Sequence, residues 1–287
     1  MVQSKKYEAH FFDKFMPFMD RDLDDLTPRE IELVRQRYIV SNFKTPLAKA
    51  KKRYDVLKNG IINSTMTLMT FEKTALYIFD PNVPQRIFTI CPWSKIIMLL
   101  RDPIERAYSE FKMVKQKKEK KMRRMMSFES VIEDDIEVLK QYGILADDIF
   151  SISANERRIR WLQYFNSIED IRGKSFIGRG LYYMQLEIWL DHYRDEKSRK
   201  KLLFIKSEDI RPNPTTKEVD LKPITDFIGL PDITIKANET IHSTKDVGEM
   251  NIATRIKLQE LFQPFNKKLF EILGKEWENV WSYNGTT

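Results

Sequence analysis

Glycine is scarce in this chain. Only 9 of its 287 residues are glycine, about 3% against a usual share of about 7%. The first is Gly60, so the 59 residues before it contain none. A phosphate-binding loop needs glycine where its backbone must approach the ligand closely. The composition therefore excludes a glycine-rich phosphate loop from the first part of the printed sequence.

Cysteine and histidine are equally scarce. Cys91 is the single cysteine, which rules out an internal disulfide and any cage of cysteine ligands around a metal. One free cysteine fits a reducing compartment. The three histidines, His10, His192 and His242, are too far apart in the sequence for a metal-ligand pattern. We therefore expect no metal.

Long apolar runs are missing too. No stretch approaches the roughly 18 apolar residues of a membrane span, and Met1–Lys6 leads into charged and aromatic residues instead of an apolar signal core. The chain therefore reads as cytoplasmic. The 49 basic and 42 acidic residues leave a net charge of +7, which favours anionic ligands such as phosphate, sulfate or a polyanion.

The patterning predicts one α/β domain over residues 1–287. The apolar runs Lys95–Leu100 and Lys201–Ile205 are typical of buried parallel strands, and Lys73–Phe79 favours a further strand. Thr27-Pro28 marks a helix start with a capping threonine. Expected helices cover residues 22–53, 104–111, 181–193, 223–228 and 255–273. Strands that alternate with helices indicate a parallel sheet with helices on its faces.

The segment after the first strand is a candidate anion site. Arg101-Asp102-Pro103 ends the strand and starts a helix, on which Ser109 lies two turns further along. An arginine fork and a hydroxyl near a helix start suit a phosphate monoester. The alternative is that Arg101 pairs with Asp102 or Glu105.

The segment from Glu8 to Asp13 is a candidate acid–base site. Strand alternation would place Glu8 and His10 on one face, where both could move protons; the alternative is a solvated edge strand. Lys73 is either an electrophilic lysine or a surface charge.

Two further patterns are weaker. Gly173-Lys174-Ser175 resembles the end of a nucleotide loop, but Ile168 occupies the position where that loop needs glycine, so we interpret it as a turn; a kinase remains the third hypothesis. The basic run Lys112–Arg124 could bind an anionic polymer, or form a solvated helix face.

Taken together, these segments resemble the sulfotransferase family that uses 3′-phosphoadenosine 5′-phosphosulfate. The nearest resemblance is to heparan-sulfate glucosaminyl O-sulfotransferases and their bacterial and algal relatives. It runs from about residue 5 to residue 281, and its most specific piece is Leu100-Arg101-Asp102-Pro103 with Arg106-Ala107-Tyr108-Ser109. Other matching pieces are Glu8-Ala9-His10-Phe11-Phe12-Asp13, Glu72-Lys73-Thr74, Arg179-Gly180-Leu181-Tyr182, Glu208-Asp209 and residues 261–281.

The resemblance implies an α/β fold of P-loop-kinase type, with a central parallel sheet flanked by helices. It implies that sulfate passes from the nucleotide to a hydroxyl or amine of a carbohydrate or small molecule, without a metal or a nucleic-acid partner. It also implies residue roles: Glu8 as general base, His10 and Asp13 as its support, Lys73 beside the transferring group, Arg101 and Ser109 on the 3′-phosphate, and Lys245 closing over the nucleotide.

One family feature is missing. Members carry a Lys-x-Gly-Thr-Thr loop, with its strand, a few tens of residues before the Glu-x-His-Phe-Phe-Asp segment, whereas seven residues precede Glu8 here. The loop cradles the 5′-phosphosulfate, so we expect weak or absent transfer by this chain. The second hypothesis is accordingly a protein that binds the nucleotide or an anionic glycan without catalysis. A lost N-terminal anchor would place the protein in the Golgi lumen.

Overall fold

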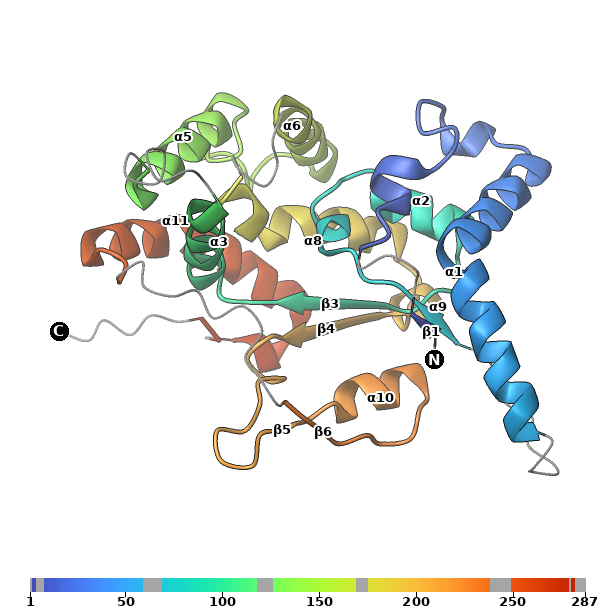
Figure 1. Ribbon diagram of the computed structural model, residues 1–287. Helices are drawn as coiled ribbons and strands as arrows, with labels where there is room; N and C mark the ends of the chain where they lie inside the picture. The colour runs from blue at the N-terminus through green and yellow to red at the C-terminus, as the bar shows by residue number, and fades with distance from the viewer. Residues whose placement is uncertain are drawn as a thin grey trace. The chain divides into compact units, whose positions relative to one another are not determined.

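The computed structural model describes residues 2–3, 8–58, 69–117, 126–168, 175–237, 249–278 and 280–281. The chain divides into two compact units, Met1–Ser94 and Lys95–Thr287 (Figure 1). The single sulfotransferase-like domain expected over residues 1–287 stays a prediction.

The first unit is mainly helical. Its short strands β1 (Val2–Gln3) and β2 (Thr70–Phe71) pair in parallel. Its helical elements are the π-helix η1 (Phe11–Phe15), the 3₁₀ helix η2 (Leu23–Asp25), α1 (Pro28–Lys58), the 3₁₀ helix η3 (Ala75–Ile78) and α2 (Val83–Ile90).

Helix α1 begins at the start signal Thr27-Pro28, and not at residue 22, where the expected helix began. The Thr27 hydroxyl accepts the backbone N–H of Glu30 at 3.3 Å, and the Glu30 carboxylate accepts the N–H of Thr27 at 2.9 Å. This reciprocal capping satisfies two N–H groups that the first helical turn leaves open. Arg21 adds an ion pair to Glu30 at 2.6 Å.

The strand predicted over Lys73–Phe79 is wrong. Residues Ala75–Ile78 form η3 instead. Aromatic and β-branched residues favour strands only when a sheet surface accepts them. Here Leu76 and Tyr77 are buried, and the Tyr77 hydroxyl bonds the backbone of residues 11 and 12, so tertiary contacts outweigh the local preference.

The second unit contains the parallel strand pair that the sequence predicts. β3 (Ile96–Leu100) pairs with β4 (Leu202–Lys206) in the register Ile96↔Leu202 to Leu100↔Lys206 (Figure 1). Strands β5 (Glu218–Val219) and β6 (Ile235–Lys236) form an antiparallel pair. The helices are α3 (Pro103–Lys117), α5 (Phe128–Gln141), α6 (Ala154–Ser167), η4 (Gly178–Gly180), α8 (Tyr182–His192), α9 (Glu196–Arg199), α10 (Lys222–Ile228), α11 (Ile252–Leu273) and η5 (Lys275–Trp277).

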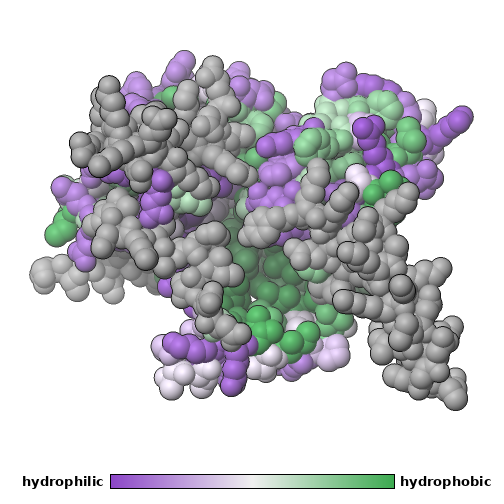
Figure 2. All heavy atoms as spheres, in the orientation of Figure 1, coloured by the Kyte–Doolittle hydropathy of each residue, from purple (hydrophilic) through white to green (hydrophobic). Residues whose placement is uncertain are grey.

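Strand β3 is buried on one face, not on both as its apolar run predicts. Met98 and Leu100 are 5% and 0% exposed, whereas Ile97 and Leu99 are 36% and 50% exposed. Alternate residues of a strand point to opposite faces, so one face carries the core contacts. Figure 2 shows hydrophobic residues at the surface over this pair of strands.

A close approach at Gly180 fixes the start of α3. A Cβ at this position would lie 2.9 Å from Pro103 and 3.0 Å from the ring of Phe262, so only glycine lets η4 pack between α3 and α11. The neighbouring turn is held by Asp135, whose carboxylate accepts the N–H groups of Ile177 and Gly178 at 2.5 and 3.1 Å. Together these contacts hold the loop that carries Arg179 against the helix that follows Arg101.

Candidate active site

His10 stands between two carboxyl groups in the first unit. Its Nδ1 lies 2.8 Å from Asp13 Oδ2, and its Nε2 lies 3.2 Å from Glu8 Oε2. The side chains of Glu8, His10 and Asp13 are 19%, 14% and 2% exposed. Because an imidazole can donate from one nitrogen and accept at the other, this row can move a proton between the more exposed Glu8 and the buried Asp13.

The row does not arise from strand alternation, and that part of the sequence prediction is wrong. His10 has φ 51° and ψ 30°, in the left-handed region, and η1 follows directly. The left-handed residue reverses the chain direction, so Asp13 comes back to the imidazole. The His10 N–H donates to Thr74 Oγ1 at 3.3 Å, which supports a conformation that is uncommon outside glycine.

The segment that contains Lys73 is tied to this row. The Ala75 N–H donates to Glu8 Oε1 at 3.4 Å, and Thr74 bonds His10 as described. These two bonds place the Lys73 backbone next to the Glu8 carboxylate, while the Lys73 side chain is exposed. The structure thus brings together Glu8, His10, Asp13 and the Lys73 segment; their catalytic roles stay predictions.

Behind the row lies a buried group that the sequence analysis did not single out. Burial raises the pKa of the Glu72 carboxyl from 4.5 to about 7, and the nearby hydroxyls of Tyr38 and Tyr77 act against this rise. The negative charge of Asp13 raises the pKa further. The three residues come from α1, η3 and the end of β2, so no local pattern links them. The only signal in the sequence is the position of Glu72 beside Lys73.

The raised pKa of Glu72 predicts a pH-dependent stability. The folded chain holds this proton more tightly than the unfolded chain. The contribution of Glu72 to the free energy of unfolding is therefore fully present below pH 4.5 and is lost as the pH rises through about 7, by an amount on the order of 3 kcal/mol. Denaturant unfolding from pH 4 to pH 8 should show this fall, and Glu72→Gln should remove it. If the free energy of unfolding changes with pH in the same way in the unchanged chain and in Glu72→Gln, the raised pKa of Glu72 is contradicted.

The candidate anion site is at the start of α3 in the second unit. Asp102 Oδ1 accepts the N–H of Ile104 at 2.8 Å and that of Glu105 at 3.3 Å, so it caps the helix. Within the described residues, the buried Nε of Arg101 has no partner. A guanidinium with an open buried donor suits an anion.

A second arginine group lies further along α3. Glu110 is 9% exposed and forms ion pairs with Arg106, at 2.6 Å, and with Arg179. Arg106 also donates to the Phe176 carbonyl, and burial lowers the pKa of Arg179. Two arginines share one carboxylate, so this group carries net positive charge on the helix that bears Ser109. The resemblance contains both arginines but gives them no role.

Several sequence predictions fall wholly or partly outside the described residues. Lys245 is one, and the Gly173-Lys174 part of the kinase-like turn is another. Of the basic run Lys112–Arg124, residues 112–117 are described, as the end of α3. Lys112 and Lys115 lie over the rings of Tyr108 and Phe111, at 4.8 and 5.3 Å from their centroids.

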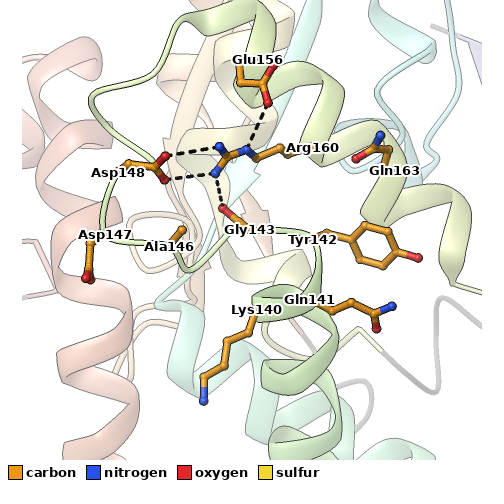
Figure 3. A pocket seen from close by; sticks show the side chains of 10 residues that line it. All are labelled: Lys140, Gln141, Tyr142, Gly143, Ala146, Asp147, Asp148, Glu156, Arg160 and Gln163. Carbon is orange, nitrogen blue, oxygen red and sulfur yellow. Dashed lines mark hydrogen bonds and ion pairs between the residues drawn. The ribbon is translucent and has the colours of Figure 1, made fainter.

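A polar hollow of about 620 Å³ in the second unit is a different place from the predicted site (Figure 3). At its edge Arg160 bonds the Gly143 carbonyl and the Asp148 carboxylate, both at 3.1 Å, and Glu156 at 3.4 Å. These bonds satisfy its guanidinium within the protein. The lining contains none of the residues singled out from the sequence.

Within the part of the chain that the structure describes, no group of three or more histidine, cysteine, aspartate or glutamate side chains is arranged to hold a metal ion. Among the same residues, no helix is both long and apolar enough to cross a membrane.

Comparison with known proteins identifies relatives. Residues 69–279 match the model of the sulfotransferase domain. The bifunctional heparan sulfate N-deacetylase/N-sulfotransferase 1 of Caenorhabditis elegans is 24% identical over 227 residues, which cover 72% of this chain and 22% of the relative. The mouse heparan sulfate glucosamine 3-O-sulfotransferase 5 is 25% identical over 213 residues, which cover 72% of this chain and 55% of the relative. The chain thus spans only part of the length of these curated relatives.

A solved structure agrees in fold. The sulfotransferase from Alicyclobacillus acidocaldarius superposes with a TM-score of 0.51 at 20% identity, covering 96% of this chain and 87% of that one. The α/β sulfotransferase fold expected from the resemblance is thereby confirmed. Since the domain match also covers well over half of the sequence, the chain belongs to the sulfotransferase family.

Proposed function

We propose that this chain transfers a sulfuryl group from 3′-phosphoadenosine 5′-phosphosulfate to a hydroxyl or amine of a carbohydrate acceptor, with Glu8 as the general base. The observation that carries the proposal is the row Glu8–His10–Asp13, in which a partly exposed carboxylate is backed by an imidazole and a buried carboxylate. Family membership supplies the reaction class.

The row supports base catalysis by the Glu8 carboxylate. Glu8 takes the proton of the acceptor hydroxyl as that oxygen forms its bond to sulfur, and the bond from sulfur to the 5′-phosphate oxygen breaks. Glu8 is held for this task by the N–H of Ala75 on one oxygen and by His10 on the other. His10 Nδ1 is fixed by Asp13. A general base must lie within hydrogen-bond reach of the proton it removes, and the exposed fraction of Glu8 leaves room for an acceptor.

The second unit supplies groups for the donor. When bound, the nucleotide provides an activated sulfuryl group and a leaving phosphate. Arg101 and Ser109 would hold its 3′-phosphate, and the open Nε of Arg101 fits an anion there. Lys73 would offset the charge that develops on the transferring group, and Lys245 would close over the nucleotide. Cationic side chains suffice for this chemistry, so the mechanism requires no metal.

The relatives favour a glycan as acceptor. Two are named for heparan sulfate, a polymer that offers both hydroxyl and amine positions. The basic residues of Lys112–Arg124 would hold such a polyanion. A mixture of the chain, the donor, small phenols and glucosamine oligosaccharides with free or acetylated amines tests the acceptor. Mass spectrometry should find a gain of one sulfate group on an oligosaccharide. Sulfation of small phenols alone, with the oligosaccharides unchanged, would overturn the glycan assignment.

A further inference from the structure

The turn that carries His10 and Asp13 is held from behind by one tyrosine oxygen. The Tyr77 hydroxyl accepts the N–H groups of Phe11 and Phe12 at 2.9 and 3.2 Å. Both N–H groups are buried, and they belong to the first residues of η1, between His10 and Asp13. Replacement of this oxygen would leave two buried donors without a partner, which is costly.

The carbonyl side of the same turn is held as well. Arg86 is 8% exposed and donates to the Phe12 carbonyl at 2.7 Å. The ring of Tyr38 packs on Phe11 and Phe12 with centroids 5.0 and 5.1 Å away. The backbone just after His10 is thus fixed by hydrogen bonds on both sides and by aromatic packing.

Glu72 lies close to the groups that hold the turn, and it acts electrostatically on Tyr38 and Tyr77. Within the described residues, Glu72 Oε2 and Asp13 Oδ1 are both buried without a hydrogen-bond partner. The two carboxyls act on each other electrostatically. A charge on Glu72 would therefore be felt by Asp13 and, through it, by the His10 imidazole.

We propose that Tyr77 and Glu72 are positioning residues of the Glu8–His10–Asp13 row: Tyr77 fixes the backbone of the turn, and Glu72 sets the charge beside Asp13. The inference rests on the proposed function for its catalytic meaning. Neither residue touches the acceptor or the donor in this assignment. Their effect on the reaction passes through the placement of Glu8 and His10.

Among the described residues, the ionisable groups that interact with Glu72 belong to the first unit. Tyr38 faces it from α1, Tyr77 from η3, Asp13 from η1 and Cys91 from the end of α2. Asp13 in turn faces His10 and the pair of Asp80 and Arg86. One arginine thus offsets two neighbouring aspartates, and a proton on Glu72 avoids a third buried negative charge.

Nuclear magnetic resonance of the histidine rings tests the inference directly, because the chain has only three histidines. The signals of His10 are assigned with His10→Gln and then recorded across pH 5 to 9 in the unchanged chain, Glu72→Gln and Tyr77→Phe. We expect both variants to shift the His10 ring nitrogens. We also expect Glu72→Gln to remove a titration step near pH 7 from the His10 signal.

The matched control is Tyr164→Phe in the second unit. Tyr164 donates its buried hydroxyl to the Asp135 carboxyl at 2.8 Å, so this variant removes a buried tyrosine hydroxyl and its hydrogen bond elsewhere. Its His10 signals should be those of the unchanged chain. Unchanged His10 signals in folded Glu72→Gln and Tyr77→Phe would overturn the inference. If Tyr77→Phe does not fold, Glu72→Gln alone decides.

Kinetics adds the catalytic part. A misplaced base costs up to about 10²-fold in rate, so Tyr77→Phe should lower kcat by about 10- to 100-fold while the KM for the nucleotide changes by less than about 3-fold. A raised nucleotide KM with an unchanged kcat would contradict a positioning role. Failure of the proposed function can be told apart from failure of the positioning inference. If the unchanged chain transfers no sulfate but the His10 signals shift in the variants, the proposed function fails and the positioning contact stands.

Discussion

Glu8→Gln is expected to lower the rate of sulfate transfer by about 10²- to 10⁴-fold, the usual contribution of a general base. Glutamine keeps the size and the carbonyl oxygen of glutamate, so the Ala75 N–H still finds an acceptor. It cannot take the proton of the acceptor hydroxyl. The affinity for the nucleotide should stay the same, because donor binding is assigned to Arg101 and Ser109. Initial rates with labelled donor measure the first effect, and calorimetry measures the second.

Glu156→Gln serves as the matched control for this variant. Glu156 is an exposed glutamate at the start of α6, and its side chain bonds Arg160. The same chemical change there should leave both rate and binding unaltered. Transfer by Glu8→Gln at the rate of the unchanged chain would end the assignment of Glu8 as base.

Arg101→Ala has the second large expected effect. Hydrogen bonds to charged groups contribute about 1.5–3 kcal/mol, so loss of the guanidinium should weaken binding of 3′-phosphoadenosine 5′-phosphate by about 10- to 150-fold. Arg101→Lys should recover only part of the affinity, because an ammonium restores the charge without the planar fork. Titration calorimetry measures both variants.

A shortened ligand controls for the position of the contact. Adenosine 5′-phosphate lacks the 3′-phosphate, so the unchanged chain should bind it weakly. Arg101→Ala should bind adenosine 5′-phosphate with the same weak affinity as the unchanged chain. Arg160→Ala, a half-buried arginine at the polar hollow, should bind both nucleotides as the unchanged chain does. An equal loss of affinity for both nucleotides in Arg101→Ala would show that Arg101 does not contact the 3′-phosphate.

Features of the fold with a local cause could be predicted from the sequence. The apolar run before Arg101 predicts β3, and Asp102-Pro103 predicts the start of α3, because capping and the fixed φ of proline act within one turn. The reciprocal cap of Thr27 and Glu30 predicts the start of α1 for the same reason. Gly229, with φ 75°, ends α10 as expected of a left-handed cap.

The site could be predicted only in part. Glu8, His10 and Asp13 are near neighbours in sequence and do meet, but through a left-handed turn that alternation does not foresee. Tyr77 bonds residues 65 and 66 positions away, and such a contact leaves no local pattern. The same holds for Glu72 with Tyr38, whose meeting depends on how α1 packs.

The most direct test of sulfuryl transfer follows the nucleotide product. The unchanged chain is incubated with 3′-phosphoadenosine 5′-phosphosulfate, with and without a glucosamine oligosaccharide, and released 3′-phosphoadenosine 5′-phosphate is measured by chromatography. The account predicts slow release that depends on the acceptor and equals the sulfate gained by the oligosaccharide. Bound donor with no acceptor-dependent release would contradict it and leave a nucleotide-binding member of the family.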